Sequence, residues 1–172
     1  GAQNPKYVMA ADAGMFRRLQ ARSGELIKLV DVAPEEPGNL DFIRECRDEV
    51  RISIAHTCTD YDTAKAAFAA GASHMTHLYN AMPGITHRAP GPIIAALEDG
   101  AEVELITDNV HIHPAMVRFT FNTFGADRRQ RHVLRPAGRP VQSGRPGRHG
   151  ARTPRDADRA ARHDCGQRDL SV

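Results

Sequence analysis

From residue 26 to residue 125, short apolar runs alternate with segments whose apolar residues recur at helical spacing. The apolar runs, which contain several β-branched residues, predict buried strands. These runs cover 26–34, 51–57, 73–79 and 103–109. Apolar residues three or four positions apart predict helices in the segments between and after them. The helical segments cover 39–50, 60–71, 91–100 and 113–125, and one more helix is expected over 4–24.

Residues at the segment ends support these boundaries. Asp60 is a predicted N-cap for the helix that Gly71 ends, and Asn39 is a predicted N-cap for the helix over 39–50. The resulting order is one helix followed by four βα units. Successive strands joined through a helix run parallel, so the sequence predicts an α/β fold with a parallel sheet.

Polar residues that could carry chemistry follow the carboxyl end of each predicted strand. In a (β/α)8 barrel this end is the active-site face. Four units make half of such a barrel, which usually needs about 250 residues. An open Rossmann-like sheet would suit the chain length, but no G-x-G-x-x-G turn follows any strand. The sequence therefore predicts a partial (β/α)8 TIM barrel of about four βα units. The residues in question are Glu35, His56, His77, Asn80, Asp108 and His111.

His56 and His77 are the strongest candidates for a metal site. They lie 21 residues apart, which is one βα unit, so they are expected to project from neighbouring strands. Two imidazoles so placed can ligate a divalent metal ion, and the alternative is a pair of structural histidines. Glu35 has three open interpretations: a ligand, a base, or a hydrogen-bond anchor for the neighbouring loops.

The segment 76–91 contains a second candidate, Arg88, beside a Pro-Gly turn. A guanidinium can bind an anionic group through two parallel hydrogen bonds, although an isolated arginine is more often a solvated surface charge. One of His111 and His113 is expected to face the pocket, and His113 precedes a proline and could simply begin a helix. His74 and His87 are interpreted as ordinary structural or surface residues.

The charge is divided sharply along the chain. Residues 1–128 hold 12 Lys and Arg against 17 Asp and Glu, whereas 129–172 hold 11 Arg, no Lys and 4 Asp. The second segment is rich in Arg, Pro and Gly and lacks aromatic residues, so it is expected to be disordered or the product of an out-of-frame reading. The alternative is an Arg-rich arm that contacts nucleic acid through charge. Two units are therefore predicted, 1–128 and 129–172.

The chain contains no apolar run long enough to cross a bilayer and no secretory leader. Cys46, Cys58 and Cys165 are odd in number and lack metal-type spacing, which is typical of reduced thiols. Together these features predict a cytoplasmic protein with no membrane partner.

The stretch "HTCTDYDTAKAAFAAGASHMTHLYNAMPGITHRAPG", with "APE" before it and "TDNVHIHP" after it, resembles N-acetylglucosamine-6-phosphate deacetylases of the amidohydrolase superfamily. The resemblance covers about residues 1–128, and "THLYNAM" followed by an arginine and Pro-Gly is its most specific part. It implies a metal-dependent (β/α)8 barrel that hydrolyses the acetamide of N-acetylglucosamine 6-phosphate. The four βα units would then contain strands 4–7 of the family barrel.

The resemblance also implies roles for individual residues. His56 and His77 correspond to two metal-ligating histidines, with zinc expected first and iron or another divalent ion as the alternative. Substrate-contacting positions of the family fall on Ala2, Asn80, Ala81, Arg88 and His111, and Arg88 would bind the phosphate. The intact enzyme is expected to be a homodimer.

The sequence also departs from the family pattern. The family's metal-ligating glutamate lies in an H-x-E-G-P motif, and its catalytic aspartate in an S-D-A-type motif after strand 8; this chain contains neither. Gln3 stands where a histidine is common, and Asn109 where a glycine is. No catalytic residue is therefore assigned, and the expectation is an inactive fragment. The alternative function is a non-catalytic sugar-phosphate or metal-binding module, with nucleic acid bound only through the charge of the Arg-rich segment.

Overall fold

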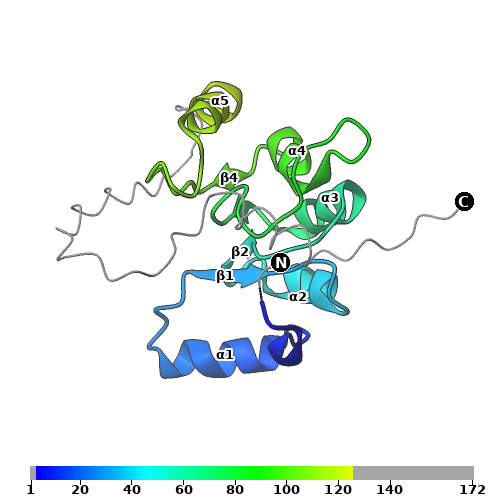
Figure 1. Cartoon of the computed structure of the whole chain (residues 1–172). Helices are drawn as coiled ribbons and strands as arrows, with labels where there is room; N and C mark the ends of the chain where they lie inside the picture. Colours follow the sequence, from blue (N-terminus) through cyan, green and yellow to red (C-terminus); the bar gives the residue numbers. More distant parts are fainter. Residues whose placement is uncertain (1–2, 126–172) are drawn as a thin grey trace, which may run out of the picture.

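The computed structural model describes residues 3–125, which form one parallel sheet and its connecting helices (Figure 1). Four strands lie in the order β1-β2-β3-β4, and every neighbouring pair is parallel. The predicted α/β fold with a parallel sheet is confirmed. The strands are β1 Leu29–Val32, β2 Arg51–Ile54, β3 His74–Met75 and β4 Glu102–Val103.

Five α-helices accompany the strands in the described residues, and those adjacent in sequence from α1 to α4 pack against one another. In Figure 1, α1 and α5 lie at opposite ends of the molecule, with α2, α3 and α4 between them. A 3-10 helix over Pro5–Tyr7 precedes the first of them. The α-helices are α1 Ala13–Arg22, α2 Asn39–Cys46, α3 Tyr61–Ala70, α4 Gly91–Glu98 and α5 Pro114–Phe124.

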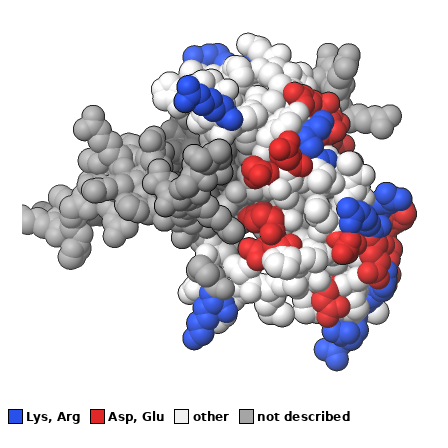
Figure 2. All heavy atoms as spheres, turned by 90° about the vertical axis from the view of Figure 1, so that its right-hand side faces the viewer, with Lys and Arg blue, Asp and Glu red and all other residues white. Residues whose placement is uncertain are grey.

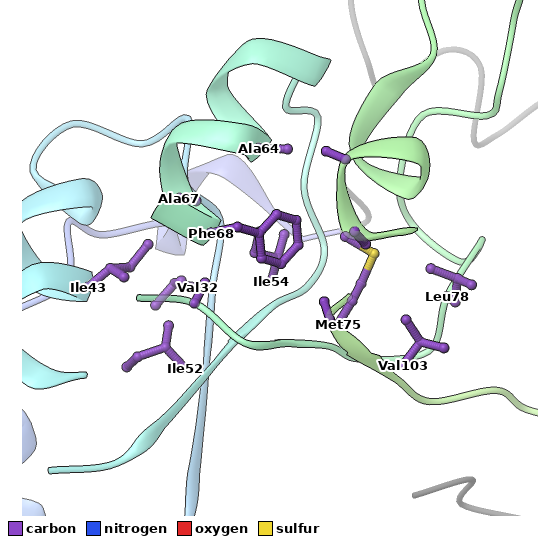
Figure 3. Packing of buried hydrophobic residues seen from close by; sticks show 14 of the residues in the cluster. Val32, Ile43, Ile52, Ile54, Ala64, Ala67, Phe68, Met75, Leu78 and Val103 are labelled. Carbon is purple, nitrogen blue, oxygen red and sulfur yellow. The ribbon is translucent and has the colours of Figure 1, made fainter. Parts of the chain in front are cut away.

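One face of the sheet carries the apolar side chains that pack against the helices. Alternate residues of the four strands point to this face, and they are buried with Ile43 of α2 and Phe68 of α3 (Figure 3). Burial of each large aliphatic side chain contributes roughly 1.5–3 kcal/mol, so this layer is the main source of stability. The strand residues of the layer are Val32, Ile52, Ile54, Met75 and Val103.

The opposite face of the sheet is polar. The strand pairing aligns Asp31 with Ser53, Ser53 with His74, and His74 with Glu102, so these side chains point to the same side. Thr76 and Glu104, which directly follow β3 and β4, continue the row two residues further along the chain. Apart from Leu29, which shares the face of Asp31, the strand residues of the two faces differ in polarity.

Some predicted boundaries were wrong. The helix expected over 4–24 begins only at Ala13, because the Asp12 side chain accepts a hydrogen bond from the backbone nitrogen of Met15 and caps it there. Asn39 is not an N-cap: Gly38 occupies that position with a φ of 82°. The prediction for α3 is confirmed, since Asp60 caps it and Gly71 follows its last residue.

The strand expected over 73–79 is shorter than predicted. Residues His77, Tyr79 and Ala81 all have positive φ values, which take the backbone out of the extended conformation. The pairing recorded for β3 therefore ends at Met75.

Acidic and basic side chains are interspersed on the face that Figure 2 shows, with several acidic ones gathered together. The predicted boundary near residue 128, and every expectation for 129–172, lie outside the described residues. Within 3–125, none of the helices combines the length and apolarity needed to cross a membrane.

Candidate metal and substrate site

His56 and His77 meet at the carboxyl ends of β2 and β3. Their ring centroids are 4.6 Å apart, with an angle of 73° between the ring planes. Both residues adopt left-handed backbone conformations, with φ values of 46° and 38°. Such conformations cost roughly 1–3 kcal/mol for residues other than glycine and cluster at functional sites. The predicted convergence of the two histidines is confirmed.

The protonation chemistry of the pair suits ligation. Burial lowers the pKa of His56, and the neighbouring His77 lowers it further, while Asp31 opposes the shift. His56 is therefore neutral at pH 7 and retains a nitrogen lone pair. The Nδ1 atom of His77 is buried and has no hydrogen-bond partner among the described residues. A buried nitrogen without a partner is costly unless another group occupies its lone pair.

This pair fits two positions in the coordination sphere of a divalent ion. Two nitrogens bound to a tetrahedral ion lie about 3.4 Å apart, and the centroids of these two rings are 4.6 Å apart. Across residues 3–125 there is no group of three His, Cys, Asp or Glu side chains that could hold a metal. The described residues thus supply two ligands, and completing the sphere requires water or other groups.

Gln3 also reaches this site. Its Nε2 atom lies 3.3 Å from Nδ1 of His56, although 53 residues separate them in the sequence. The segment that follows Gln3 is held by Asn39, whose side chain accepts a hydrogen bond from the Ala11 backbone nitrogen at 2.7 Å and donates to the Ala33 carbonyl at 2.9 Å. Asn39 therefore ties the N-terminal segment to the loop that follows β1.

Glu35 braces the loop that carries His56. Its carboxylate accepts a hydrogen bond from the Thr57 hydroxyl and another from the Cys58 backbone nitrogen, each at 2.5 Å. The contacts support the interpretation of Glu35 as a hydrogen-bond anchor between neighbouring loops. It forms no three-residue metal group with His56 and His77.

The loop after β3 places two of the expected substrate residues beside His77. Asn80 donates from Nδ2 to the carbonyl oxygens of His77 and Leu78, at 3.2 and 3.3 Å. Ala81 has a φ of 52°, and the Tyr79 hydroxyl lies 2.6 Å from the Thr120 hydroxyl on α5. These contacts hold the unusual backbone of the loop in place.

Arg88 lies further along the same loop. It is exposed and makes no hydrogen bond or ion pair with another residue of the described part of the chain. Its guanidinium is therefore open to solvent and accessible to an anion. This exposure agrees both with phosphate binding and with an ordinary surface charge.

His111 is held by a carboxylate-centred turn after β4. Asp108 accepts hydrogen bonds from the backbone nitrogens of Val110 and His111, both at 2.9 Å, and lies 2.7 Å from His111 Nδ1. These hydrogen bonds lower the pKa of Asp108 to about 2. With Nδ1 occupied, His111 offers its other nitrogen, Nε2, to a ligand.

The remaining candidates are resolved more simply. His113 caps α5 by accepting a hydrogen bond from the Ala115 backbone nitrogen, so its helix-start interpretation is confirmed. His74 is buried and bonded to Ser53, and His87 is exposed, which agrees with their structural and surface interpretations. Ala2 lies outside the described residues.

Sequence reasoning missed the polar row beneath the histidines. Thr76 donates to Asp31 at 2.8 Å and lies 2.9 Å from the Ser53 hydroxyl. The available signal was the alternation of polar and apolar residues within each strand.

Four parallel βα units with histidines converging at the carboxyl ends of neighbouring strands define this unit as part of a TIM-barrel-like enzyme fold. A solved structure shares it: a mutant of N-acetyl-D-glucosamine-6-phosphate deacetylase from Mycobacterium smegmatis, in complex with N-acetyl-D-glucosamine-6-phosphate. It matches with a TM-score of 0.72 and 37% identity, over 80% of this chain and 36% of that chain.

Curated proteins lead to the same family. N-acetylglucosamine-6-phosphate deacetylase of Bacillus subtilis (strain 168) is 43% identical over 130 residues, or 74% of this chain and 33% of that protein. N-acetylgalactosamine-6-phosphate deacetylase of Escherichia coli O157:H7 is 38% identical over 117 residues, or 67% of this chain and 31% of that protein. Over about 74% of its length the chain is related to the N-acetylglucosamine-6-phosphate deacetylases, consistent with a fragment of that family.

The relatives named above are hydrolases that act on amides. The chain spans about a third of the length of the curated relatives that it matches. No family model matches the chain.

Proposed function

We propose that the chain carries part of a metal-dependent site that hydrolyses the acetamide of an N-acetylated amino-sugar phosphate, with N-acetylglucosamine 6-phosphate as the expected substrate. The observation that carries this proposal is the edge-to-face contact of His56 and His77 at neighbouring strand ends. The relatives support the substrate class, because they act on N-acetylglucosamine and N-acetylgalactosamine 6-phosphates.

In this proposal His56 and His77 hold a divalent ion, with zinc expected first. When bound, such an ion polarises the amide carbonyl and lowers the pKa of a water molecule. The chain's own contribution is to hold the two imidazoles in place: burial lowers the pKa of His56, and the strand ends set the separation of the rings.

The loop residues position the substrate. Arg88, which has no partner within residues 3–125, binds the phosphate, and a guanidinium matches the geometry of phosphate oxygens. Asn80 and Ala81 lie beside His77 and contact the sugar phosphate. His111, oriented by Asp108, donates from Nε2 to the substrate when it is protonated there. These residues orient the substrate, and such positioning can lower a reaction barrier by several kcal/mol.

The proposal extends to the activity of this chain alone. The described residues supply two metal ligands and no assigned base, so we expect no turnover without groups from elsewhere in the family barrel. From the family resemblance we also expect the intact enzyme to be a homodimer, which light scattering would test.

Calorimetric titration of the full chain with Zn²⁺ tests the metal site. We expect weak binding that is lost in His56→Ala and in His77→Ala, whereas His87→Ala, a change at an exposed histidine, leaves it unchanged. Binding that survives the double change His56→Ala with His77→Ala would contradict the proposed ligands.

A second titration with N-acetylglucosamine 6-phosphate tests the phosphate contact. Arg88→Ala should weaken binding of the phosphorylated sugar, while Arg44→Ala, which removes a guanidinium paired with Asp41 on α2, should not. Equal binding of unphosphorylated N-acetylglucosamine would count against the role of Arg88. Detectable deacetylation by the chain alone, abolished in His77→Ala, would refute the expected inactivity.

A further inference from the structure

A continuous row of hydrogen bonds crosses three strands directly beneath the two histidines. His74 Nδ1 lies 2.9 Å from the Ser53 hydroxyl, which lies 2.9 Å from the Thr76 hydroxyl, which donates to Asp31 Oδ1 at 2.8 Å. Ser53 and His74 are buried, and Asp31 is exposed at the end of the row. Each of β1 and β2 supplies one member, and the segment that begins with β3 supplies two.

The direction of every bond in this row is fixed by the carboxylate. An ionised carboxylate only accepts, and the Thr76 hydroxyl donates to Asp31 at 2.8 Å and is also hydrogen-bonded to Glu104, so its single proton is committed to these two carboxylates. Thr76 can then only accept from Ser53, and Ser53 can only accept from His74. The Nδ1 atom of His74 therefore carries the proton, and the row runs from His74 to Asp31 without a mismatched pair.

Thr76 is the residue immediately before His77, at the point where regular pairing stops. The ladder between β2 and β3 pairs residues only as far as Met75, after which the Thr76 backbone nitrogen donates to the Ile54 carbonyl at 3.2 Å. His77 then turns into a left-handed conformation with a φ of 38°. A strained turn persists only where its surroundings hold it, and the Thr76 side chain provides two such contacts.

We propose that Asp31 is a positioning residue for the site: through the Thr76 hydroxyl it fixes the backbone from which His77 projects, and thus the contact between the His77 and His56 rings. The importance of this contact for metal binding rests on the proposed function. The geometric part stands on the hydrogen bonds alone. Partners outside the first coordination sphere commonly change metal affinity by about 10- to 100-fold when they are removed.

Four variants separate this role from a general effect on folding. Asp31→Ala and Thr76→Val each remove the bond that joins the two residues. Asp31→Asn retains a carbonyl acceptor without the charge, and Thr76→Ser retains the hydroxyl. Asp48→Ala is the control for loss of an exposed carboxylate, because the Asp48 side chain is 91% exposed and its ion pair with the adjacent Arg47 is long, at 3.8 Å.

The first readout needs no metal. In the metal-free full chain, nuclear Overhauser contacts between the ring protons of His56 and His77 should be clear in the parent and should weaken in Asp31→Ala and Thr76→Val. They should persist in Asp31→Asn, Thr76→Ser and the control. Unchanged ring contacts in both disruptive variants would overturn the proposal, even if the stability of the chain fell. This readout is independent of whether the histidines bind a metal at all.

The second readout is Co²⁺ affinity, followed by absorption of the full chain. We expect Asp31→Ala and Thr76→Val each to weaken binding about tenfold, and the double variant to weaken it no more than either single change. Asp31→Asn should remain near the parent. If Asp31→Asn weakens binding as much as Asp31→Ala, then charge rather than the hydrogen bond is responsible, and the proposal is wrong. Absence of Co²⁺ binding by the parent would instead contradict the proposed function and leave the ring contacts to decide.

Discussion

The Glu35 carboxylate, after β1, accepts a hydrogen bond from the Thr57 hydroxyl, after β2, at 2.5 Å. The same carboxylate accepts a second bond from the Cys58 backbone nitrogen, and Thr57 is completely buried. Thr57 directly follows His56, whose positive φ requires support. The two loops at this edge of the sheet are therefore joined by one side chain, independently of the row that ends at Asp31.

Replacement of Glu35 should loosen the His56 loop. In Glu35→Ala both donors lose their acceptor, and an unsatisfied buried donor costs about 1–3 kcal/mol, so we expect the free energy of unfolding to fall by about 1–2 kcal/mol. Amide hydrogen exchange at Cys58 should accelerate in the folded state. Glu36→Ala is the neighbouring control, and an equal effect there would show that the loop is insensitive to the Glu35 carboxylate.

Asn39 should be among the most sensitive polar residues of the chain. Asn39→Ala leaves the Ala11 nitrogen and the Ala33 carbonyl without their side-chain partner, so the free energy of unfolding should fall by about 2 kcal/mol. Asn39→Asp keeps the acceptor for Ala11 but cannot donate to Ala33, so its loss of unfolding free energy should lie between those of the parent and Asn39→Ala. If the new carboxylate repels the Ala33 carbonyl, the loss should be larger than in Asn39→Ala. Urea denaturation of the three proteins measures the difference.

A parent-like stability for Asn39→Ala would mean that the N-terminal segment is not held in this way. The exposed Asn4 provides a control, because its side chain accepts a local hydrogen bond from the Lys6 nitrogen and no other from the described residues. Asn4→Ala should change stability by a few tenths of a kcal/mol at most.

The sequence was a good guide to the order of elements because local chemistry determines them. Apolar runs locate the strands, and Asp60 with Gly71 bounds α3 through bonds within a few residues. Asn39 misled the prediction because its side chain serves distant backbone groups rather than its own helix. Its residue type is the same in both roles, so only the tertiary structure distinguishes them.

The candidate site also contains features that the sequence predicts and features that only the tertiary structure reveals. His56 and His77 were predictable as a pair, since equal positions at the ends of adjacent parallel strands must converge. The bond from Thr76 to Asp31 was not predictable in this way. It joins β1 to the residue after β3, which are not neighbours in the sheet, and it depends on the pairing register and curvature of the sheet. The approach of Gln3 likewise depends on where Asn39 holds the segment that follows Gln3.

Gly71 should not tolerate a side chain. A Cβ there would lie 2.6 Å from Cδ and 2.7 Å from Cβ of Arg47, and the φ of 128° is unfavourable for any residue but glycine. Gly71→Ala should therefore lower the free energy of unfolding by about 1–3 kcal/mol. Gly100→Ala is the matched control, because its φ is 65° but no atom lies within 4 Å of the added carbon.

The two glycines differ in φ, 128° against 65°, and in the space for a Cβ, so a change at Arg47 is needed to isolate the steric part. Gly100→Ala should show the strain alone, about 1 kcal/mol, and Gly71→Ala should exceed it. Truncation in Arg47→Ala should relieve part of the cost of Gly71→Ala, as a double-mutant cycle would show. Equal losses in the two single variants would mean that Arg47 simply moves aside.

Stability should fall as the pH decreases below about 6.5, in part because of His74. Burial lowers the pKa of His74, Arg51 lowers it further, and Glu102 and Asp31 oppose the shift. The unfolded chain, with an ordinary histidine pKa of about 6.5, then binds protons more readily than the folded chain. Stabilisation from the neutral His74 is complete above that pH and is lost as the pH falls through the lower folded-state value, by at most about 1.4 kcal/mol per pH unit.

His74→Gln tests this origin of the pH dependence. Glutamine keeps polar atoms near Ser53 but does not titrate, so the loss of unfolding free energy between pH 7.5 and 5.5 should be smaller than in the parent.

Burial also raises the pKa of Glu104, whose carboxylate lies 3.6 Å from His74 Nε2, and a raised carboxyl pKa favours the folded state at low pH. The opposing trend from Glu104 should therefore become visible once His74 is replaced. His87→Gln, at an exposed histidine, should reproduce the parent curve, and an unchanged curve for His74→Gln would show that other groups dominate acid unfolding.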